Sequence, residues 1–512
     1  MDRKLGFPTT NARGTHIALL LAAVALVLIP YALLGIVVPI GRDSGVFMYG
    51  GSTINSGGAP YLDAWDHKGP LLYIFNAAGL RLFDGPRGVI LLEGFLLFVA
   101  LLFSMYCWKR FLSLGWVLIA SAAFSLAYYG AFEGGNLTET WCIPFLLSSY
   151  SLAFVYLSEQ DDLRRRRCAI LLPMAIGTSF AVAALTRPNN GVGLVFLAFS
   201  LFVFKIKGRF RFSAIIVMAG AAIVLPVVLW LYKADAMDAF IDQYLVFNAS
   251  YVQGASMFAR AKTFYHLFEA TILSPLGVVM LLVSGFIVFA ERRPSANEPA
   301  SFFNRLMMSV FVVESLAQAL SGQSLLHYAA LALPALALLL VGLLVRIDQE
   351  GQRFLAIRKN RVLAFVLLAL FCMAAMRPAY AIRDLLQGGT QVTGATQNTL
   401  TGYLREHTSA ADSVVIHGAE TWLLVTAGRR SPSNITYYYP AVAHFKDSYK
   451  KYISDIVQGA PRYIIESPTS CGLSKEPCSP DPTLFVELKD YLLAEYQLEA
   501  TLRGYKFWRR KA

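Results

Sequence analysis

The sequence predicts an α-helical polytopic membrane protein with about eleven spans and a small C-terminal α/β domain. Of its 512 residues, 56% are hydrophobic and only 15% are charged, which is far more apolar than a soluble globular protein. The apolar residues are gathered into runs, most of them near the roughly 20 residues that cross ~30 Å of hydrocarbon. Each run has to be helical, because lipid cannot hydrogen-bond an exposed backbone.

The predicted spans alternate with polar loops along the first three quarters of the chain. The first run is too long for a signal peptide and no small-residue cleavage site follows it, so we expect a retained anchor. The predicted spans are residues 17–40, 89–107, 112–129, 140–157, 168–185, 191–204, 213–231, 272–290, 306–320, 328–345 and 362–376.

The formal net charge of +12 raises the question of a nucleic-acid partner, which the positions of Lys and Arg decide. These residues gather in alternate loops, namely before the first span and at 109–110, 164–167, 205–211, 292–305 and 346–361. This is the positive-inside bias, which places the N-terminus in the cytoplasm and the C-terminus outside. We therefore expect membrane lipids and no nucleic acid as partners.

The chain divides into a membrane domain, residues 1–377, and an extracytoplasmic α/β domain, residues 378–512. The first outer loop, 41–86, includes an apolar stretch at 71–82 that is too short to span and suits a helix at the interface. The α/β domain alternates strand and helix signals. Its strands are expected at 413–416, 435–439 and 462–465 and as a final strand pair around 504, and its helices at 420–427, 444–457 and 484–496.

The cysteines predict at most one disulfide. Cys471 and Cys478 flank a polar loop in the outer domain, which favours a local, structural disulfide between them. The other four cysteines fall in or beside predicted spans, where an inert buried thiol is expected.

The most informative stretch is residues 41–73, which read GRDSGVFMYGGSTINSGGAPYLDAWDHKGPLLY. Asp43, Asp63, Asp66, His67 and Lys68 crowd this loop beside the membrane, and its glycines and prolines restrict its shape. Any one of them alone would be read as a solvated loop residue. So many ionisable groups beside the bilayer together indicate a functional site.

The pattern of this loop resembles the first outer loop of GT-C glycosyltransferases. The resemblance is closest to the bacterial branch related to protein O-mannosyltransferases and to lipid A aminoarabinose and galacturonic acid transferases. The matching residues are Asp43, Tyr49, Pro60, Tyr61, Asp63, Asp66, His67, Lys68, Pro70, Leu71 and Tyr73. The resemblance implies a multi-pass protein of the bacterial inner membrane that uses a polyprenyl-phosphate sugar donor and an extracytoplasmic glycan, lipid or protein acceptor.

Two departures from the family pattern concern the chemistry. Relatives often carry Asp-Glu where this chain has Asp43 and Ser44, which leaves one carboxylate at the base position. They often carry Glu-Lys-Pro-Pro where this chain has His67, Lys68, Gly69 and Pro70. A divalent metal is therefore not certain as a cofactor, although His67 is itself able to bind one.

Transfer from a phosphate ester requires one base and some positive charge, because the leaving group departs as a weakly basic anion. Asp43 is the expected general base for the acceptor hydroxyl, and Lys68 is expected to hold the donor phosphate. The resemblance makes Tyr49, Tyr61, Asp63 and Asp66 the expected substrate-binding residues of the loop.

Three residues outside this loop are further candidates. Glu139 matches an acidic position of relatives and would bind sugar or metal, although the helix dipole explains a Glu there equally well. Arg187 lies at the outer end of a span, which favours phosphate or carboxylate binding over snorkelling. His327 is expected either to face the donor phosphate or a metal, or simply to be hydrogen-bonded at a helix start.

The sequence favours an inverting glycosyltransferase over a transporter or flippase of a lipid-linked sugar. Transporters tend to show paired halves and broken helices near mid-membrane, and the sequence has neither signal. A scaffold that has kept the fold and lost the activity is the weaker alternative. Neither the sugar nor the acceptor can be read from the residues.

Overall fold

The structure is a computed structural model that describes residues 12–82, 85–204, 208–249, 256–290, 299–349, 393–437, 446–468 and 482–511, together with residues 376, 379 and 383. Within these ranges, six helices are long and apolar enough to cross a membrane. They are Arg13–Val37, Pro86–Lys109, Thr138–Ser158, Asp162–Ala184, Arg209–Lys233 and Leu326–Asp348. The predicted multi-pass helical architecture is therefore confirmed.

The predicted count of about eleven spans is not confirmed. Leu114–Gly130 and Pro188–Phe204 are apolar but shorter than the six long helices, and at roughly 1.5 Å per residue they cover less than ~30 Å of hydrocarbon. Met257–Ile272 and Pro275–Gly285 add one span only if they are counted together across a bend of 74°. The last predicted span lies outside the described residues except at residue 376.

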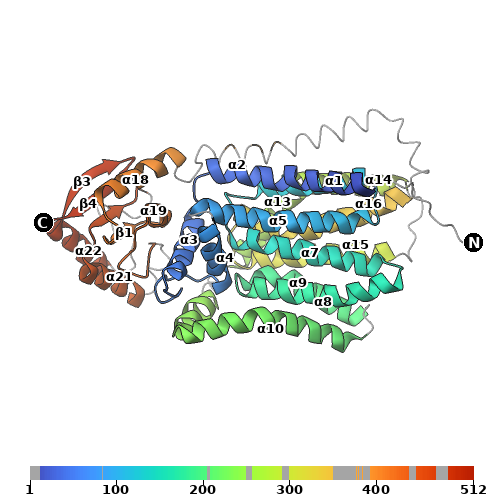
Figure 1. The fold of residues 1–512 in the computed structure, drawn as a ribbon, viewed down its shortest axis with the longest axis horizontal. Coiled ribbons are helices and arrows are strands. Elements are labelled where there is room, and N and C mark those ends of the chain that lie inside the picture. The colour runs from blue at the N-terminus through green and yellow to red at the C-terminus, as the bar shows by residue number, and fades with distance from the viewer. Residues whose placement is uncertain are drawn as a thin grey trace, which may run out of the picture.

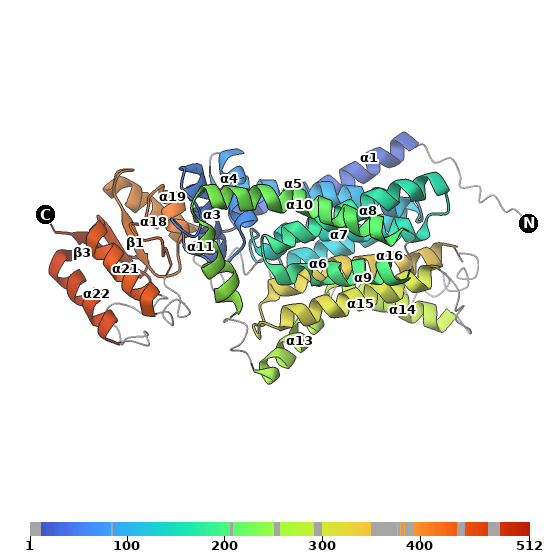
Figure 2. The ribbon, with the colours of Figure 1, turned by 90° about the horizontal axis from the view of Figure 1, so that it is seen from below.

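The bundle helices run side by side, with the N-terminal end of the chain and the α/β domain at opposite ends (Figure 1, Figure 2). They are α1 (Ala12–Ala23), α2 (Ile29–Val37), α5 (Pro86–Lys109), α6 (Leu114–Gly130), α7 (Thr138–Ser158), α8 (Asp162–Ala184), α9 (Val192–Phe204), α10 (Arg209–Lys233), α14 (Pro275–Ala290), α15 (Pro299–Ala319) and α16 (Leu333–Gln349). The helix α13 (Met257–Ile272) leads into α14.

The first span contains a π-helical segment, η1 (Val24–Leu28), which ends two residues before Pro30. A proline has no backbone N–H, so the carbonyl four residues earlier loses its helical partner. That carbonyl belongs to Leu26, and it accepts a hydrogen bond of 3.0 Å from the hydroxyl of Tyr129. The neighbouring helix α6 thus supplies a hydrogen-bond donor to this carbonyl.

Two helices, α3 (Arg42–Asn55) and α4 (Pro70–Leu82), lie between the bundle and the α/β domain (Figure 1). The helix α4 covers the stretch at 71–82 that was expected to be helical at the interface. A Cβ on Gly45 of α3 would lie 2.5 Å from the backbone nitrogen of Trp422, so only glycine fits this contact. The close approach fixes α3 against the α/β domain.

The α/β domain is built on a four-stranded sheet in the order β1-β2-β4-β3. The parallel pair β1 (Val414–His417) and β2 (Tyr463–Glu466) is fully buried, and β3 (Tyr496–Leu502) and β4 (Tyr505–Arg510) pair antiparallel. The helices are α18 (Gly394–His407), α19 (Trp422–Ala427), α21 (Lys446–Gly459) and α22 (Pro482–Glu495).

One predicted strand of this domain is wrong over its described part. Residues 435–437 are not in a strand, because side chains rather than a neighbouring strand satisfy the backbone. Ser433 Oγ accepts from the Ile435 N–H at 3.2 Å, and Thr421 Oγ1 donates to the Thr436 carbonyl at 3.1 Å. The helix α18 was not predicted.

The cysteine predictions have different outcomes. Cys107, Cys142 and Cys168 are buried free thiols, as expected of cysteines in or beside spans. Cys471 and Cys478 lie outside the described residues, so their disulfide stays a prediction.

Candidate active site

A cavity of about 390 Å³ lies where the bundle meets the α/β domain. Its walls come from α3, from the loop between α3 and α4, from the ends of bundle helices and from the α/β domain. The polar and aromatic side chains among its lining residues are Arg42, Asp43, Ser44, Phe47, Trp65, Asp66, His67, Lys68, Glu133, Phe247, His327, Tyr328 and Tyr437. The cavity therefore brings together five of the predicted site residues, namely Asp43, Asp66, His67, Lys68 and His327.

Asp43 is in the first turn of α3 and is exposed to the cavity. The positive end of the helix dipole favours a carboxylate at this position. Within the described part of the chain, no hydrogen bond or ion pair engages its side chain. The adjacent Arg42 forms an ion pair of 3.2 Å with the buried Glu420 of the α/β domain. The backbone around Asp43 is thus anchored while its carboxylate stays available to accept a proton.

Lys68 and His67 form a hydrogen bond between the ammonium nitrogen and Nε2, 2.7 Å apart. Burial, together with the charges of Lys68 and Arg187, holds the pKa of His67 well below its ordinary value. A neutral imidazole can accept a hydrogen bond from the ammonium group of Lys68. The remaining N–H groups of Lys68 can then be directed into the cavity.

Asp66 connects the membrane domain to the α/β domain. Its carboxylate accepts hydrogen bonds from the hydroxyls of Tyr73 at 2.8 Å and Tyr437 at 3.2 Å, and from the backbone N–H of His67 at 2.7 Å. Burial raises the pKa of Asp66, while the charge of Lys68 and these hydrogen bonds lower it. The protein's own donors thus occupy most of the acceptor positions of Asp66.

Tyr61 supports Lys68 from behind the cavity. Its hydroxyl donates to the Lys68 carbonyl at 2.7 Å, and its ring packs edge-to-face against Tyr73. Its φ of 73° is unusual for a bulky residue, and the amide of Gln243 holds its carbonyl at 2.8 Å. Tyr61 therefore positions the loop and does not line the cavity.

Glu139, Arg187 and His327 form one charged cluster beside the cavity. Arg187 pairs with Glu139, and its guanidinium carbon lies 4.1 Å from the ring centre of Tyr328. His327, in η4 (Leu326–Ala332), has Nδ1 2.6 Å from Glu133 and Nε2 4.0 Å from Glu139. The three predicted residues thus lie together, although they come from three separate segments of the chain.

Glu133 belongs to a loop of four consecutive residues with positive φ. These are Glu133 at 46°, Gly134 at 95°, Gly135 at 78° and Asn136 at 54°. Such a run is costly for the residues with a Cβ, so the surroundings have to hold it in place. The loop directs the Glu133 side chain toward His327.

Asn136 is the residue that holds this loop. Its backbone N–H donates to Glu93 at 2.8 Å, and its side-chain oxygen accepts from the Trp141 indole at 2.8 Å. Its side-chain nitrogen donates to the hydroxyl of Ser44 at 2.9 Å, and it also pairs with the amide of Asn76. One buried asparagine thus connects α3, α4, α5 and α7 directly behind Asp43.

Tyr49 and Asp63 lie elsewhere. They line a second cavity of about 550 Å³, which also includes Arg430 and Lys451 of the α/β domain. The hydroxyl of Tyr49 accepts from the Ser431 N–H at 3.1 Å, and Asp63 accepts from the Ala59 N–H at 2.8 Å. The structure therefore does not place these two predicted substrate-binding residues beside Asp43.

The possible metal role of His67 stays a prediction. Among the described residues, no three His, Cys, Asp or Glu side chains converge in a way that could hold a metal ion. The Nε2 atom of His67 faces the Lys68 ammonium. His67 is thus better suited to position Lys68.

Sequence reasoning did not single out Glu133, Asn136 or Tyr437. The glycines of residues 132–136, FEGGN, signal an unusual backbone and could have drawn attention to Glu133 and Asn136. Tyr437 carries no such signal, because it reaches Asp66 only through the docking of the α/β domain.

Comparison with solved structures gives matches over nearly the whole chain. ArnT from Cupriavidus metallidurans bound to undecaprenyl phosphate matches with a TM-score of 0.60 at 15% identity, over 96% of this chain and 97% of that chain. Its apo state matches with a TM-score of 0.61 at 14% identity, over 98% of both chains. The archaeal oligosaccharyltransferase AglB from Archaeoglobus fulgidus matches with a TM-score of 0.46 at 13% identity, over 88% of this chain and 69% of that chain.

No protein-family model matches the sequence, and no curated protein matches it. The likeness to ArnT, at 14% and 15% identity, concerns the fold, and it extends over both the membrane helices and the C-terminal domain. The resemblance of the first outer loop to GT-C glycosyltransferases implied this architecture. The chain therefore shares the fold of ArnT over nearly its whole length.

Proposed function

We propose that this protein is a glycosyltransferase that moves a sugar from a polyprenyl-phosphate donor to an acceptor on the side of the membrane where the cavity opens. The observation that carries the proposal is the carboxylate of Asp43, which has no partner among the described residues and shares one cavity with the ammonium of Lys68. The solved ArnT structure of the same fold contains undecaprenyl phosphate, which supports a donor of this class.

The donor phosphate would bind at Lys68. The neutral His67 accepts one of the three N–H groups of Lys68, so two remain for phosphate oxygens. Tyr61 fixes the backbone carbonyl of Lys68, and Asp66 fixes the backbone N–H of His67. Arg187 beside the cavity and His327 in its wall add positive charge, although both are paired with carboxylates.

Transfer would proceed by direct displacement at the anomeric carbon. Asp43 takes the proton of the acceptor hydroxyl, the acceptor oxygen forms the new bond, and the bond to the phosphate oxygen breaks. The leaving group departs as polyprenyl phosphate, whose added negative charge Lys68 stabilises. Attack opposite the leaving group inverts the anomeric configuration.

The proposed location is the bacterial inner membrane, with the N-terminus in the cytoplasm and the cavity outside. The positive-inside pattern of the loops supports this orientation. Reporter fusions in the loop around residue 41 test it directly, and a cytoplasmic signal would contradict it. A flippase of lipid-linked sugars is the alternative function, and it would move the donor without cleaving it.

The test is a transfer assay with purified protein, labelled polyprenyl-phosphate sugars and candidate acceptors, in which release of polyprenyl phosphate is measured. Asp43→Asn should lower kcat by about 10²- to 10⁴-fold, the usual contribution of a general base, and leave donor binding intact. Asp238→Asn, an exposed carboxylate of α11 (Met237–Phe240) away from the cavity, is the matched control. Near-normal turnover in Asp43→Asn would contradict the proposal, and donor movement without cleavage would support the flippase.

A further inference from the structure

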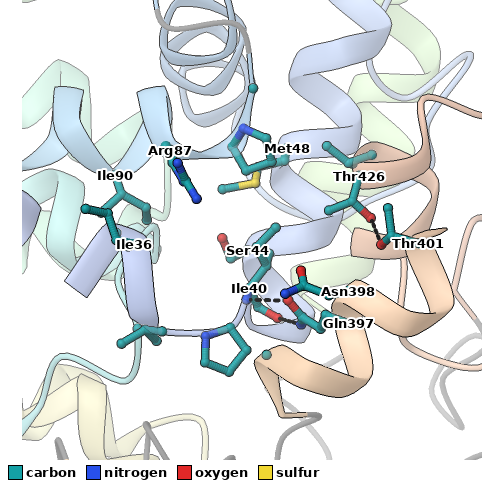
Figure 3. Close-up of a pocket in the computed structure, with 18 of the residues that line it drawn as sticks. Ile36, Ile40, Ser44, Met48, Arg87, Ile90, Gln397, Asn398, Thr401 and Thr426 are labelled. Carbon is teal, nitrogen blue, oxygen red and sulfur yellow. Dashed lines mark hydrogen bonds between the residues drawn. The ribbon is translucent and has the colours of Figure 1, made fainter. Parts of the chain in front are cut away.

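A groove of about 520 Å³ lies where the bundle meets the α/β domain, next to the cavity of the candidate active site. It is formed by the end of α2, the first turns of α3 and α5, and the helices α18 and α19 of the α/β domain. Arg87 projects into it from α5, with Ile36 and Ile90 on one side and Asn398 and Thr401 on the other (Figure 3). The groove therefore has an apolar wall and a polar wall.

The polar wall is positively charged. Arg87 and Arg405 both line the groove, and no acidic residue is among its described lining residues. Arg87 is exposed and forms no hydrogen bond or ion pair with another described residue. The guanidinium of Arg405 uses one N–H to donate to the Thr426 carbonyl at 2.5 Å. The two side chains thus retain several donors that fit an anionic, oxygen-rich group.

The position of Arg87 also favours an anion. It lies in the first turn of α5, where the helix dipole and the free backbone N–H groups are unfavourable to a cation. The same features attract a negatively charged group, and Arg87 would add to that attraction once such a group is bound.

The apolar wall continues onto the lipid-facing surface of the bundle. Leu34, Ile36, Val37 and Ile90 line the groove, and Ile36 is 61% exposed and Val37 49% exposed. These residues belong to helices that are long and apolar enough to cross the membrane. A ligand whose charged head lies at Arg87 would therefore have hydrocarbon chains against α2 and α5.

We propose that this groove binds an anionic phospholipid of the surrounding bilayer, with its phosphate at Arg87 and Arg405 and its acyl chains along α2 and α5. The charge complementarity selects an anionic head group, and the apolar wall selects a lipid over free phosphate. A groove of about 520 Å³ is in the size range of small-molecule sites.

Such a lipid would connect the membrane domain to the α/β domain. The two are already joined at the groove, because Gln397 of α18 exchanges hydrogen bonds of 3.0 and 2.8 Å with the backbone of Ile40. Ser44 lines both this groove and the candidate active site. The bound lipid would thus steady the first turn of α3, which carries Asp43.

Lipid binding to the purified full-length protein can be measured by native mass spectrometry during titration with phosphatidylglycerol. Arg87→Gln should weaken phosphatidylglycerol binding by about tenfold or more, the usual effect of losing a charge-assisted hydrogen bond. Arg81→Gln removes an exposed arginine at the end of α4 that does not line the groove, and it should leave the affinity unchanged.

Two further titrations identify the ligand. Phosphatidylcholine should bind at least about tenfold more weakly than phosphatidylglycerol to the unmodified protein, because its head group carries no net charge. Inorganic phosphate should not compete with phosphatidylglycerol, because it cannot use the apolar wall. Equal affinities for both lipids, competition by phosphate alone, or equal losses in Arg87→Gln and Arg81→Gln would each overturn the proposal. None of these measurements depends on glycosyltransferase activity.

Discussion

The ammonium nitrogen of Lys68 lies 2.7 Å from Nε2 of His67, so two consecutive residues share a hydrogen bond in the candidate active site. Consecutive cations would repel each other, but burial keeps the pKa of His67 low and its imidazole neutral at pH 7. The pair thus presents one positive charge with a fixed direction.

Lys68→Ala should raise the donor KM by about 10- to 100-fold, because a hydrogen bond to a charged group is worth about 1.5–3 kcal/mol. Lys68→Arg should recover part of the affinity, since the charge is kept but its geometry changes. Steady-state kinetics with varied donor concentration measures both. An unchanged donor KM in Lys68→Ala would remove this residue from the phosphate site.

The donor KM should rise at alkaline pH earlier than an ordinary lysine would require. Burial and the charge of Arg187 lower the pKa of Lys68. The ammonium is present below that pKa and is lost as the pH rises through it, so donor binding weakens in that window. A pH profile of kcat/KM measures the effect, and Lys68→Arg should remove the alkaline limb because arginine stays protonated.

Donor binding should weaken at acid pH only well below the ordinary pKa of histidine. The pKa of His67 is lowered, so the imidazole stays a hydrogen-bond acceptor until the pH falls through that lower value. Protonation then removes the acceptor for Lys68 and puts a second cation beside it. His67→Gln keeps a hydrogen-bond acceptor that does not titrate. The weakening of donor binding at acid pH that is due to residue 67 should therefore be absent in this variant. An acid limb unchanged in His67→Gln would assign it to another group.

Glu139 and Arg187 should couple strongly in a double-mutant cycle of stability. Their side chains are only 1% and 14% exposed, and removing one partner leaves an uncompensated buried charge at a cost of about 3–5 kcal/mol. The double variant Glu139→Gln with Arg187→Gln should lose clearly less than the sum of the single variants. Denaturant unfolding in detergent measures the free energies. Stable single variants with poor donor binding would instead show that the pair acts mainly on substrate.

Asn136→Ala should destabilise the protein through both hydrogen bonds and backbone strain. The substitution leaves the buried Trp141 indole and the Ser44 hydroxyl without their partner, at about 1–3 kcal/mol for each buried group left unsatisfied. It also puts alanine at a φ of 54°, a conformation that asparagine tolerates through the polar contacts of its side chain. Asn136→Gly loses the same hydrogen bonds and relieves the strain, so it should be the less destabilised of the two. Equal melting temperatures for the two variants would show that the strain contributes nothing.

The sequence by itself determined the membrane architecture and the location of the candidate site. Long apolar runs must be helical in lipid, and this local rule placed the helices that the structure describes. The same kind of local reasoning placed strands β1 and β2, and it drew attention to the loop that holds Asp43 and Lys68. Local reasoning could not give the number of spans, because short apolar helices give the same composition signal as complete spans.

Only the tertiary structure decided which of these residues meet. Asp66 and Tyr437 are 371 residues apart, and Glu133 and His327 are 194 residues apart, so no local pattern links them. The same docking of the α/β domain placed Tyr49 and Asp63 in a different cavity from Asp43, although all three lie in the segment 41–86, which the sequence predicts as one outer loop. Contacts between remote segments arise from the packing of whole helices and domains, whereas a sequence pattern reports only on neighbouring residues.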